Sequence, residues 1–374
     1  TMHRSGGMGK LVNAVGAMSG TSLDGIDVAL IATDGEDVVE RRAFASVPYD
    51  AAFRDRLRRA LADAAGLEER TARPGILADV ERELTDRHAD AIRGFLKDTG
   101  VDPGDVDLVA FHGQTVLHAP ERRLTVQIGD GPRLARALGL RVVCDLRAAD
   151  AAAGGQGAPL APVYHRALLR GIGGEAMAVL NIGGVANVTF IGADGELLAF
   201  DTGPGNALLD DWMLRTTGTA IDRGGACAAS GRVDEAALAT LMDHAYFSAP
   251  PPKSLDRNTF DVSALAGLLP ANGAATLVAF TAEAVARAAA FAPEPPRRWI
   301  VTGGGRYNRA MMAALAALLG ATVETAEMAG LDGDAVEAEA WAYLGVRCLK
   351  GLAITFPGTT GVGEALTGGV VVTP

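Results

Sequence analysis

The sequence predicts an α/β protein of two domains, and three observations support this prediction. The 374 residues are enough for two hydrophobic cores, and a composition of 49% hydrophobic and 21% charged residues is that of a globular protein. Apolar runs of strand length alternate with segments of helical periodicity. An order of strand, polar loop, strand, turn and strand near the start returns about 160 residues later.

The first copy of this order consists of three apolar runs. Residues 11–18 end in a loop of Gly, Ser and Thr, and residues 28–33 and 38–46 are joined by the turn Asp34-Gly35. Two apolar runs around Asp-Gly predict a β-hairpin.

The second copy has its turn at Asp194-Gly195 and its apolar runs at residues 176–181, 187–191 and 197–200. The copies share a phrase, LIATDGE beginning at Leu30 and FIGADGE beginning at Phe190. We interpret this as an internal duplication of one βββ unit. Chance similarity around a common turn dipeptide is the alternative.

Helices and further strands fill the rest of the chain. Helical spacing predicts helices over residues 51–65, 77–99, 207–216, 276–292, 309–319 and 336–351. Short apolar runs predict strands over residues 106–111, 124–128, 140–144 and 299–301. The Gly- and Thr-rich tail, residues 357–374, is expected to be irregular.

Composition also excludes several classes of protein. The net charge of −11, without a run of Lys or Arg, argues against nucleic-acid binding. Three scattered cysteines, Cys144, Cys227 and Cys348, suit a reducing compartment better than a disulfide framework or a zinc site. The polar first ten residues do not form a signal peptide, and no apolar run reaches the ~20 residues that span a bilayer. We therefore expect a cytoplasmic protein that does not enter a membrane.

Three glycine-containing loops follow predicted strands, at residues 16–25, 181–187 and 302–308. Backbone N–H groups and hydroxyls in such loops can bind phosphate oxygens, although the first loop is no Walker motif because no G-K-[ST] follows. A plain hairpin turn is the alternative for each loop taken alone. Two equivalent loops in a duplicated unit predict that the domains clamp a nucleotide triphosphate in a cleft that closes on binding.

Asp201 is the strongest catalytic candidate. It stands at the end of an apolar run, in the stretch FDTGPGN, beside glycines that leave room for a ligand. A turn-forming Asp is the alternative. An aspartic protease would need two such carboxylates, and no second D-[ST]-G occurs in the chain.

Other polar residues are candidates for binding. Asp24 or Asp27 could reach Mg²⁺ directly or through water, with a solvated turn residue as the alternative. His112 and Gln114 follow a predicted strand, and we give His112 no acid–base role. The run from Asp145 to Asp150 precedes the glycines of residues 154–157 and predicts a polar binding loop around Arg147.

Taken in order, these loops resemble one family, the anhydro-N-acetylmuramic acid kinases. The resemblance runs from about Lys10 to Phe356 and is carried by eight motifs, GAMSGTSLDGID, FHGQT, TVQIGDG, GGQGAPLAPVYH, NIGGVANVT, FDTGPGNALLD, PPPKSLDRNTF and VTGGGRYN. It implies the two-domain actin/hexokinase (ribonuclease H-like) fold, with a duplicated βββαβα unit around an inter-domain cleft. It also implies conversion of 1,6-anhydro-N-acetylmuramic acid, ATP and water to N-acetylmuramic acid 6-phosphate and ADP in cell-wall recycling.

The resemblance also implies functional residues and partners. Asp201 falls on the family's general base, and ATP with Mg²⁺ is the expected cofactor. The nucleotide is expected at Ser19, Gly20, Thr21, Ser22, Leu23, Asp24, Gly25, Asp27, Asn181, Gly183, Gly184, Asn187, Gly303, Gly304, Gly305 and Asn308. The amino sugar is expected at His112, Gln114, Arg147, Asp150, Gln156, Asn206 and Glu337. A homodimer is the expected assembly.

Two lobes are expected to share these sites. The N-terminal lobe, residues 10–145, carries the first phosphate loop, with the tail 357–374 as a candidate addition. The C-terminal lobe, residues 146–356, carries the second phosphate loop, the catalytic Asp and the adenosine loop.

The chain departs from the family pattern in two places. Ala148 and Ala149 follow Arg147 where some members carry several Arg, and residues 255–258 replace a frequent T-G-R-E. Both places bear on sugar contacts. The remaining alternative is another sugar or carboxylate kinase of the same fold. A regulator would need a basic DNA-binding segment, a chaperone would need a peptide-binding domain, and a filament protein would leave Asp201 without an evident role beyond nucleotide hydrolysis.

Overall fold

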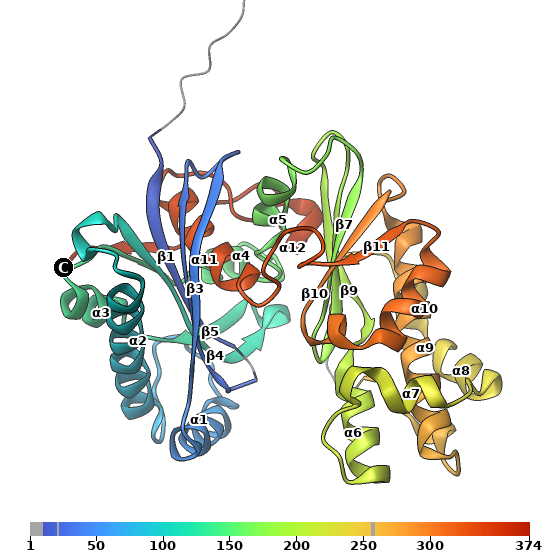
Figure 1. The fold of residues 1–374 in the computed structure, drawn as a ribbon. Coiled ribbons are helices and arrows are strands. Elements are labelled where there is room, and N and C mark those ends of the chain that lie inside the picture. The colour runs from blue at the N-terminus through green and yellow to red at the C-terminus, as the bar shows by residue number, and fades with distance from the viewer. Residues whose placement is uncertain (1–9, 21, 256–258) are drawn as a thin grey trace, which may run out of the picture. The chain divides into compact units, whose positions relative to one another are not determined.

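The computed structural model describes residues 10–20, 22–255 and 259–374. The chain divides into two compact units, Thr1–Ile172 with Ala335–Pro374, and Gly173–Asp334 (Figure 1). The expected boundary between the lobes was at residues 145/146, whereas the first unit continues to Ile172. The C-terminal lobe was expected to extend to residue 356, with a boundary at 356/357, whereas the second unit ends at Asp334. The difference arises because two later helices, α5 (Pro162–Leu169) and α11 (Val336–Leu349), pack with the first unit.

The first unit is built on a seven-stranded sheet. Its strands run in the order β12-β6-β4-β1-β2-β3, and β5 pairs with β4. Their bounds are β1 Val12–Ser19, β2 Gly25–Thr33, β3 Val39–Pro48, β4 Leu108–Ala119, β5 Leu124–Ile128, β6 Val142–Cys144 and β12 Val370–Val372. β1, β2 and β3 form an antiparallel meander, whereas β4 is parallel to β1, and β6 is parallel to β4.

The second unit repeats this plan in five strands. Its order is β11-β10-β7-β8-β9, with β7, β8 and β9 antiparallel and β10 and β11 parallel to β7. The bounds are β7 Met177–Ile182, β8 Val185–Ile191, β9 Leu197–Pro204, β10 Arg298–Thr302 and β11 Thr322–Thr325. The order 6-4-1-2-3 therefore matches 11-10-7-8-9, which confirms the duplicated unit and the two-sheet α/β fold of the actin/hexokinase type.

The shared D-G-E phrase lies in the connection between two antiparallel strands in both copies. Asp34 Oδ1 accepts hydrogen bonds from the backbone of Glu36, Asp37 and Val38, and Asp194 Oδ1 accepts one from the backbone of Glu196. Asp is suited to this place because its short side chain hydrogen-bonds to backbone N–H groups a few residues on.

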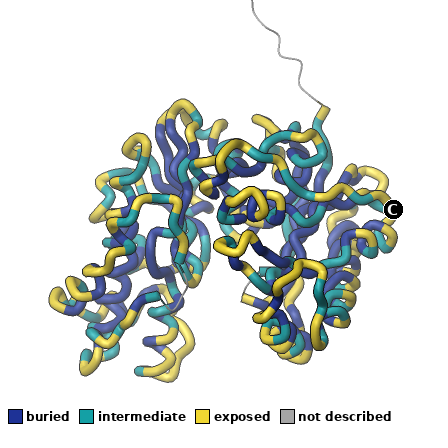
Figure 2. The backbone as a smooth tube through the Cα atoms, turned by 180° about the vertical axis from the view of Figure 1, so that it is seen from behind, coloured by how far each residue is buried: buried dark blue, intermediate teal, exposed yellow. Residues whose placement is uncertain are grey.

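Helices cover the sheet of the first unit. They are α1 Ala51–Ala64, α2 Leu77–Thr99, α3 Gly131–Leu138, α4 Ala148–Ala152, α5, α11 and α12 Pro357–Thr360, with 3₁₀ turns at Pro103–Asp105 and Pro120–Arg122. Asp50 caps α1 and Asp130 caps α3 through their carboxylates, and α2 ends at Gly100 with a positive φ of 69°. The strands and inner helix faces form the buried core, dark blue in Figure 2.

The helix α11 lies unusually close to β1. A Cβ built on Gly16 would come within 2.0 Å of the carbonyl oxygen of Ala338, and one on Gly345 within 2.7 Å of the Ala110 side chain. Only glycine therefore fits at either position. This packing fixes the place of every side chain that α11 presents.

The helices of the second unit are α6 Asn206–Thr217, α7 Ala226–Ser230, α8 Glu235–Met242, α9 Pro270–Ala288 and α10 Arg309–Leu319. Five 3₁₀ turns accompany them, at Arg223–Gly225, Ala245–Ser248, Ser263–Leu265, Ala289–Phe291 and Gly304–Tyr307. A Cβ on Gly203 of β9 would lie 2.6 Å from Ala284 of α9, so this helix also packs closely on its sheet.

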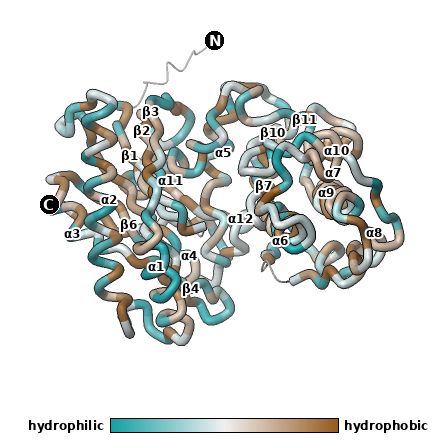
Figure 3. Tube along the Cα trace, turned by 60° about the horizontal axis from the view of Figure 1, so that its bottom comes forward, coloured by the Kyte–Doolittle hydropathy of each residue, from teal (hydrophilic) through white to brown (hydrophobic). Residues whose placement is uncertain are grey.

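Residues Pro270–Phe291 form a helix long and apolar enough to cross a membrane, which the sequence was expected not to contain. In the second unit, 61% of the apolar stretch of this helix is buried, and α9 contacts α6, α7, α8, α10 and β9. Figure 3 shows the apolar colour of α9 and its neighbour α10. Its apolarity is that of a helix in a protein core.

Two further expectations are corrected. The tail is ordered: it forms α12, and β12 pairs antiparallel with β6 at the edge of the first sheet. The strand expected to end at Phe111 continues to Ala119, because Gly113 adopts a φ of 72° where a Cβ would lie 2.2 Å from the carbonyl of Ile128. His112 and Gln114 therefore lie within β4 and not beyond it.

Candidate active site

The first predicted phosphate loop is the hairpin between β1 and β2. Leu23 adopts a positive φ of 58°, and its N–H donates to the carbonyl of Gly20 at 3.2 Å. Ser22 donates to Asp24 Oδ1 at 2.7 Å. Thr21 lies outside the described residues. A non-glycine residue held at positive φ indicates a loop whose conformation is fixed by its surroundings.

Ser19, the last residue of β1, fixes the start of this loop through two hydrogen bonds. Its buried hydroxyl donates to Gln114 Oε1 at 2.6 Å and accepts from the Tyr49 hydroxyl at 3.0 Å. Gln114 is fully buried, so its side chain contacts Ser19 and not a surface. Sequence reasoning missed Tyr49, which has no motif of its own and reaches Ser19 from beyond β3.

Acidic residues gather near this loop. Glu337, in the first turn of α11, is exposed, but desolvation by the surrounding protein raises its pKa. Arg147 opposes that shift, and Asp27 and Asp24 add to it. Three carboxylates that repel one another form a region of negative potential, which suits a hydrated divalent cation carried by phosphates. The described residues contain no group of three His, Cys, Asp or Glu placed to hold a metal by themselves.

Arg147, His112 and Trp341 form a stack. The Arg147 guanidinium lies 4.9 Å from the centroid of the Trp341 ring, and the His112 ring lies 4.3 Å from it. Desolvation lowers the pKa of Arg147 to about 10, with Glu337 opposing the shift. Trp341 was not predicted. The available signal was its position on the late helix, one turn after Glu337 and on the same face.

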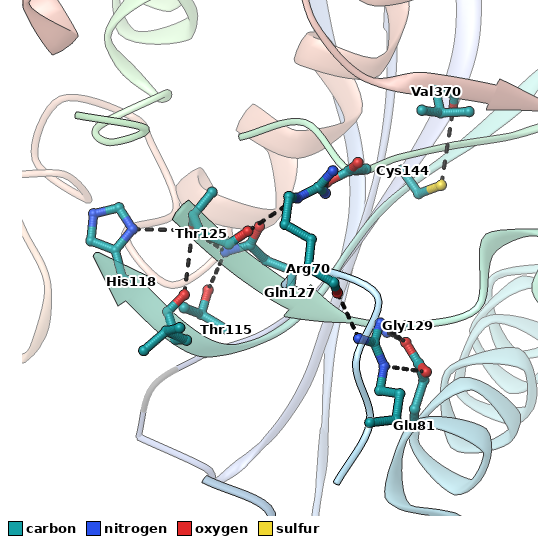
Figure 4. Close-up of polar contacts among 12 residues, drawn as sticks. Arg70, Glu81, Thr115, His118, Thr125, Gln127, Gly129, Cys144 and Val370 are labelled. Carbon is teal, nitrogen blue, oxygen red and sulfur yellow. Dashed lines mark hydrogen bonds and ion pairs between the residues drawn. The ribbon is translucent and has the colours of Figure 1, made fainter. Parts of the chain in front are cut away.

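A cavity of about 210 Å³ opens beside His112 in the first unit. Figure 4 shows part of its lining, where Gln127 donates to Thr115 and Thr125. Arg70 is paired with Asp145, which adopts a positive φ of 58°. The Oε1 atom of Gln127 is buried and has no protein partner among the described residues. The TVQIGDG motif therefore contributes polar groups to the lining of this cavity that the sequence prediction did not include.

The expected sugar residue Asp150 lies within α4, and the expected sugar residue Gln156 lies in the loop that follows this helix. Asp150 is buried, and its two oxygens accept from the backbone of Gly157 and the hydroxyl of Thr360, each at 2.7 Å. The backbone of Gln156 donates to the carbonyl of Thr360 at 2.8 Å. Asp150 thus ties this glycine loop to α12 with both oxygens.

The second predicted loop joins β7 to β8 and meets the start of α6. The backbone of Asn206 donates to the carbonyl of Gly183 at 2.7 Å, and its side chain donates to that of Ile182 at 3.1 Å. Gly184 is exposed. Asn187 lies directly opposite Asp201 in the β8–β9 pair. The structure thus brings the second loop, Asn206 and Asp201 to one end of the sheet.

The third loop follows β10. Gly303 has a φ of 73°, and a Cβ there would lie 2.4 Å from Asn181 Oδ1, so the second and third loops touch. Asn308 is buried and caps α10 by accepting from the backbone of Met311 at 3.0 Å. Its side-chain oxygen therefore serves the helix start. Gly304 is exposed at this junction of strand and helix, whereas Gly305 is buried, and a Cβ there would lie 2.3 Å from the Ile182 side chain.

Asp201 is in β9 and half-buried. Its Oδ2 accepts a hydrogen bond from the backbone N–H of Leu255 at 2.8 Å. Desolvation raises its pKa to about 6, although the Leu255 hydrogen bond opposes the shift. A carboxylate that is partly desolvated and titrates close to neutral pH is suited to accept a proton from a bound molecule.

Comparison with known proteins gives one consistent result. A family model described as anhydro-N-acetylmuramic acid kinase matches residues 12–374. A protein named anhydro-N-acetylmuramic acid kinase from Rhizorhabdus wittichii is 57% identical over 96% of this chain and 99% of its own length. One of the same name from Methylobacterium nodulans is 54% identical over 97% of this chain and all of its own. Among solved structures, component A of (R)-2-hydroxyglutaryl-CoA dehydratase from Acidaminococcus fermentans covers 90% of this chain and 99% of its own at 14% identity, with a TM-score of 0.48, a weak likeness.

Proposed function

Because the chain belongs to the anhydro-N-acetylmuramic acid kinase family, we propose that it opens the 1,6-anhydro ring with water while it phosphorylates O6, and that Asp201 is the general base. The activity is that of the family, an ATP-dependent kinase of anhydro-N-acetylmuramic acid in peptidoglycan recycling. The observation that supports the base is the Asp201 carboxylate, held by one backbone N–H and with its pKa raised to about 6.

The chemistry explains why a carboxylate is needed beside water. In the anhydro sugar, O6 is part of an internal acetal and has no proton to lose. Water attacks C1, its proton passes to Asp201, and the C1–O6 bond breaks with its electron pair on O6. O6 then attacks the γ-phosphorus of ATP, and ADP leaves. The products are N-acetylmuramic acid 6-phosphate and ADP, and Asp201 returns its proton to solvent.

The pKa of Asp201 fits this role. A base with a pKa of about 6 is mostly ionised at neutral pH, and it binds a proton more strongly than an ordinary Asp. The single hydrogen bond from Leu255 occupies Oδ2 and orients the carboxylate. Oδ1 is the oxygen we assign to the water.

The phosphates of ATP are assigned to the loops. Backbone N–H groups and hydroxyls of residues 19–25 bind phosphate oxygens in the first unit, and those of residues 181–187 do so in the second. Gly303, Gly304 and Gly305 admit the adenosine. Asp24 or Asp27 would hold Mg²⁺, which neutralises phosphate charge when it is bound with ATP.

The sugar contacts fall into two groups. Arg147, Glu337 and Asn206 are assigned to the sugar itself, and His112 orients Arg147 by accepting a hydrogen bond from its Nε. Gln114, Asp150 and Gln156 are assigned a supporting role, because their contacts are within the protein. Gln114 contacts Ser19, Asp150 contacts Gly157, and Gln156 contacts Thr360. A homodimer and a cytoplasmic location are further parts of this proposal. They rest on the family resemblance and on three cysteines that are not linked to one another.

The source of the oxygen at C1 tests the reaction. Turnover in ¹⁸O-labelled water should place one label at C1 of the product, measured by mass spectrometry before exchange through the open-chain sugar. Unlabelled product would indicate simple phosphoryl transfer, as in another sugar kinase of this fold. ADP release with the anhydro sugar should also exceed that with N-acetylmuramic acid or glucose.

Replacement of the base tests its assignment. Asp201→Asn keeps the size of the side chain and an oxygen that can accept from Leu255, but it cannot take the proton. We expect kcat to fall by roughly 10²-fold or more while ATP binding is retained. Near-normal turnover of this variant would refute Asp201 as the base.

A further inference from the structure

We propose that Lys253 is a positioning residue for Asp201. Its ammonium, enclosed by three aromatic rings, pins the segment of residues 250–255 whose backbone holds the Asp201 carboxylate. No described motif assigns Lys253 a role. The inference rests on the proposed role of Asp201 as the base, and it extends that role to what keeps the base in place.

The segment holds Asp201 at two points. The N–H of Asp201 donates to the carbonyl of Lys253 at 3.3 Å, and Oδ2 of Asp201 accepts from the N–H of Leu255 at 2.8 Å. The backbone is thus fixed by one residue of the segment and the carboxylate by another. Any shift of the segment would move the carboxylate or leave it without its donor.

The Lys253 side chain fixes that segment to the rest of the unit. Its Nζ donates to the carbonyl of Tyr246 at 3.0 Å. It also lies 4.6 Å from the ring centroid of Phe291, 4.7 Å from that of Tyr246 and 5.3 Å from that of Phe200. A cation over several ring faces is held by the ring quadrupoles, more strongly as water is excluded. In the described part of the chain, Nζ contacts this carbonyl and these rings.

Two of these rings are tied to Asp201 itself. Phe200 is its neighbour in β9, and Tyr246 donates from its hydroxyl to the carbonyl of Asp201 at 2.5 Å. Phe291 ends the turn that follows α9. The Lys253 cation therefore connects residues 250–255, strand β9 and the turn that follows α9, all within the second unit.

The choice of lysine is itself informative. The chain has 34 Lys and Arg residues, of which only Lys10, Lys97, Lys253 and Lys350 are lysines. An ammonium is compact and carries three donors that can turn toward a carbonyl, whereas a guanidinium is planar and wider. A pocket bounded by three rings and one carbonyl suits the smaller cation.

Loss of the cation should change the base in a defined direction. If the segment loosens, Asp201 loses the Leu255 hydrogen bond, which is the contribution that lowers its pKa. Among residues 10–20, 22–255 and 259–374, the other titratable groups that contact Asp201 are Tyr246, through its hydroxyl, and Lys253, through its backbone. The acidic limb of the activity profile should then move to higher pH.

Lys253→Met, of similar length but without charge, tests the inference, with Lys253→Arg as the conservative variant. Lys97→Met, at an exposed lysine in the last turn of α2, is the matched control. We expect Lys253→Met to lower kcat about 10-fold or more, to change the KM for ATP less than about twofold, and to raise the pH of the acidic limb. Lys253→Arg keeps the charge in a wider group and should recover kcat only in part, to a value between those of Lys253→Met and wild type, and Lys97→Met should match wild type.

A double variant separates this inference from the role of the base. If Lys253 acts through Asp201, Lys253→Met should add nothing to the loss caused by Asp201→Asn. An equal further loss in the Asp201→Asn background, or a lowered melting temperature with kcat and the pH limb unchanged, would overturn the positioning role. High activity of Asp201→Asn alone would instead overturn the proposed base, whatever Lys253→Met does.

Discussion

Arg147 donates from Nε to Nε2 of His112 across 3.0 Å, and this contact fixes the state of the histidine. With Nε2 as an acceptor, Nδ1 carries the proton and donates to the carbonyl of Gly113 at 2.9 Å. Burial first, and then the Arg147 charge, lower the pKa of His112 well below its ordinary value. His112 therefore remains a neutral imidazole that holds Arg147, and it has no proton to exchange near neutral pH.

Replacement of Arg147 should impair sugar binding selectively. Arg147→Met leaves His112 Nε2 and the carbonyl of Gly157 without their donor and removes the cation over Trp341. We expect the KM for the sugar to rise about 10-fold or more, with the KM for ATP changed less than about twofold. Steady-state kinetics with each substrate varied measures both values. Arg141→Met, an exposed arginine just before β6, is the control, and a selective loss of ATP binding would contradict the assignment.

Activity should fall in acid as Asp201 takes up a proton. A general base must be ionised, so log kcat/KM should decline with a slope near one below the pKa of about 6. His112 should add no second limb, because its pKa is displaced far downward. A kcat/KM profile from pH 4.5 to 8.5, corrected for enzyme stability, checks this. A limb near pH 4, as for an ordinary Asp, would be inconsistent with a desolvated base.

Asp201 should also cost stability at neutral pH. The pKa of Asp201 in the folded protein is about 6, above its ordinary value of 3.8. An ionised, partly desolvated carboxylate therefore lowers the stability of the folded protein above pH 6, and the stability is regained as the pH falls through 6 toward 4. Two pKa units correspond to about 3 kcal/mol at most. Asp201→Asn should therefore melt a few degrees higher than wild type at pH 7.5. The difference should shrink as the pH falls from 6 toward 4 and vanish only below the ordinary pKa of 3.8, where the carboxyl group is neutral in both the folded and the unfolded protein. A difference that stays equal from pH 7.5 to pH 4 would argue against the shift.

The Ser19–Gln114 hydrogen bond should affect ATP more than sugar. Gln114→Leu leaves the buried Ser19 hydroxyl without its acceptor and should cost about 1–3 kcal/mol of stability. By loosening the first loop, it should raise the KM for ATP several-fold. Tyr49→Phe, which removes the other partner of Ser19, should act in the same direction. A rise confined to the KM for the sugar would place Gln114 in the sugar site, as its motif alone suggested.

Close packing of α11 should make Gly16 irreplaceable. In Gly16→Ala, the new Cβ would lie 2.0 Å from the Ala338 carbonyl, so helix and strand must separate. We expect a loss of about 1–3 kcal/mol in urea unfolding, together with lower activity, since α11 carries Glu337 and Trp341. Gly94→Ala is the matched control, because Gly94 lies within α2 with nothing inside 4 Å of a Cβ, and it should gain about 0.5–1 kcal/mol. Equal stability of the two variants would contradict the close approach.

Local patterns in the sequence determined the strands, the turns and the loops. Asp34 and Asp194 each define a hairpin through their own side chain, and alternating apolar runs mark the strands of both copies, so the duplicated sheets could be predicted before any contact was known. Asp201 could be placed only in part, because its neighbours predict a strand that ends at Phe200, whereas β9 continues through Asp201 to Pro204. Short-range periodicity and turn chemistry act over a few residues, which is why they can be read directly.

What surrounds Asp201 was decided only by tertiary structure. Leu255 and Lys253 reach it from more than 50 residues away, and Trp341 reaches His112 from more than 200. Packing also extended β4 past Gly113 and turned the tail into an edge strand. Desolvation and hydrogen-bond partners depend on which distant segments meet. The pKa of Asp201 and the contacts of Lys253 with three rings are therefore determined only once the chain has folded.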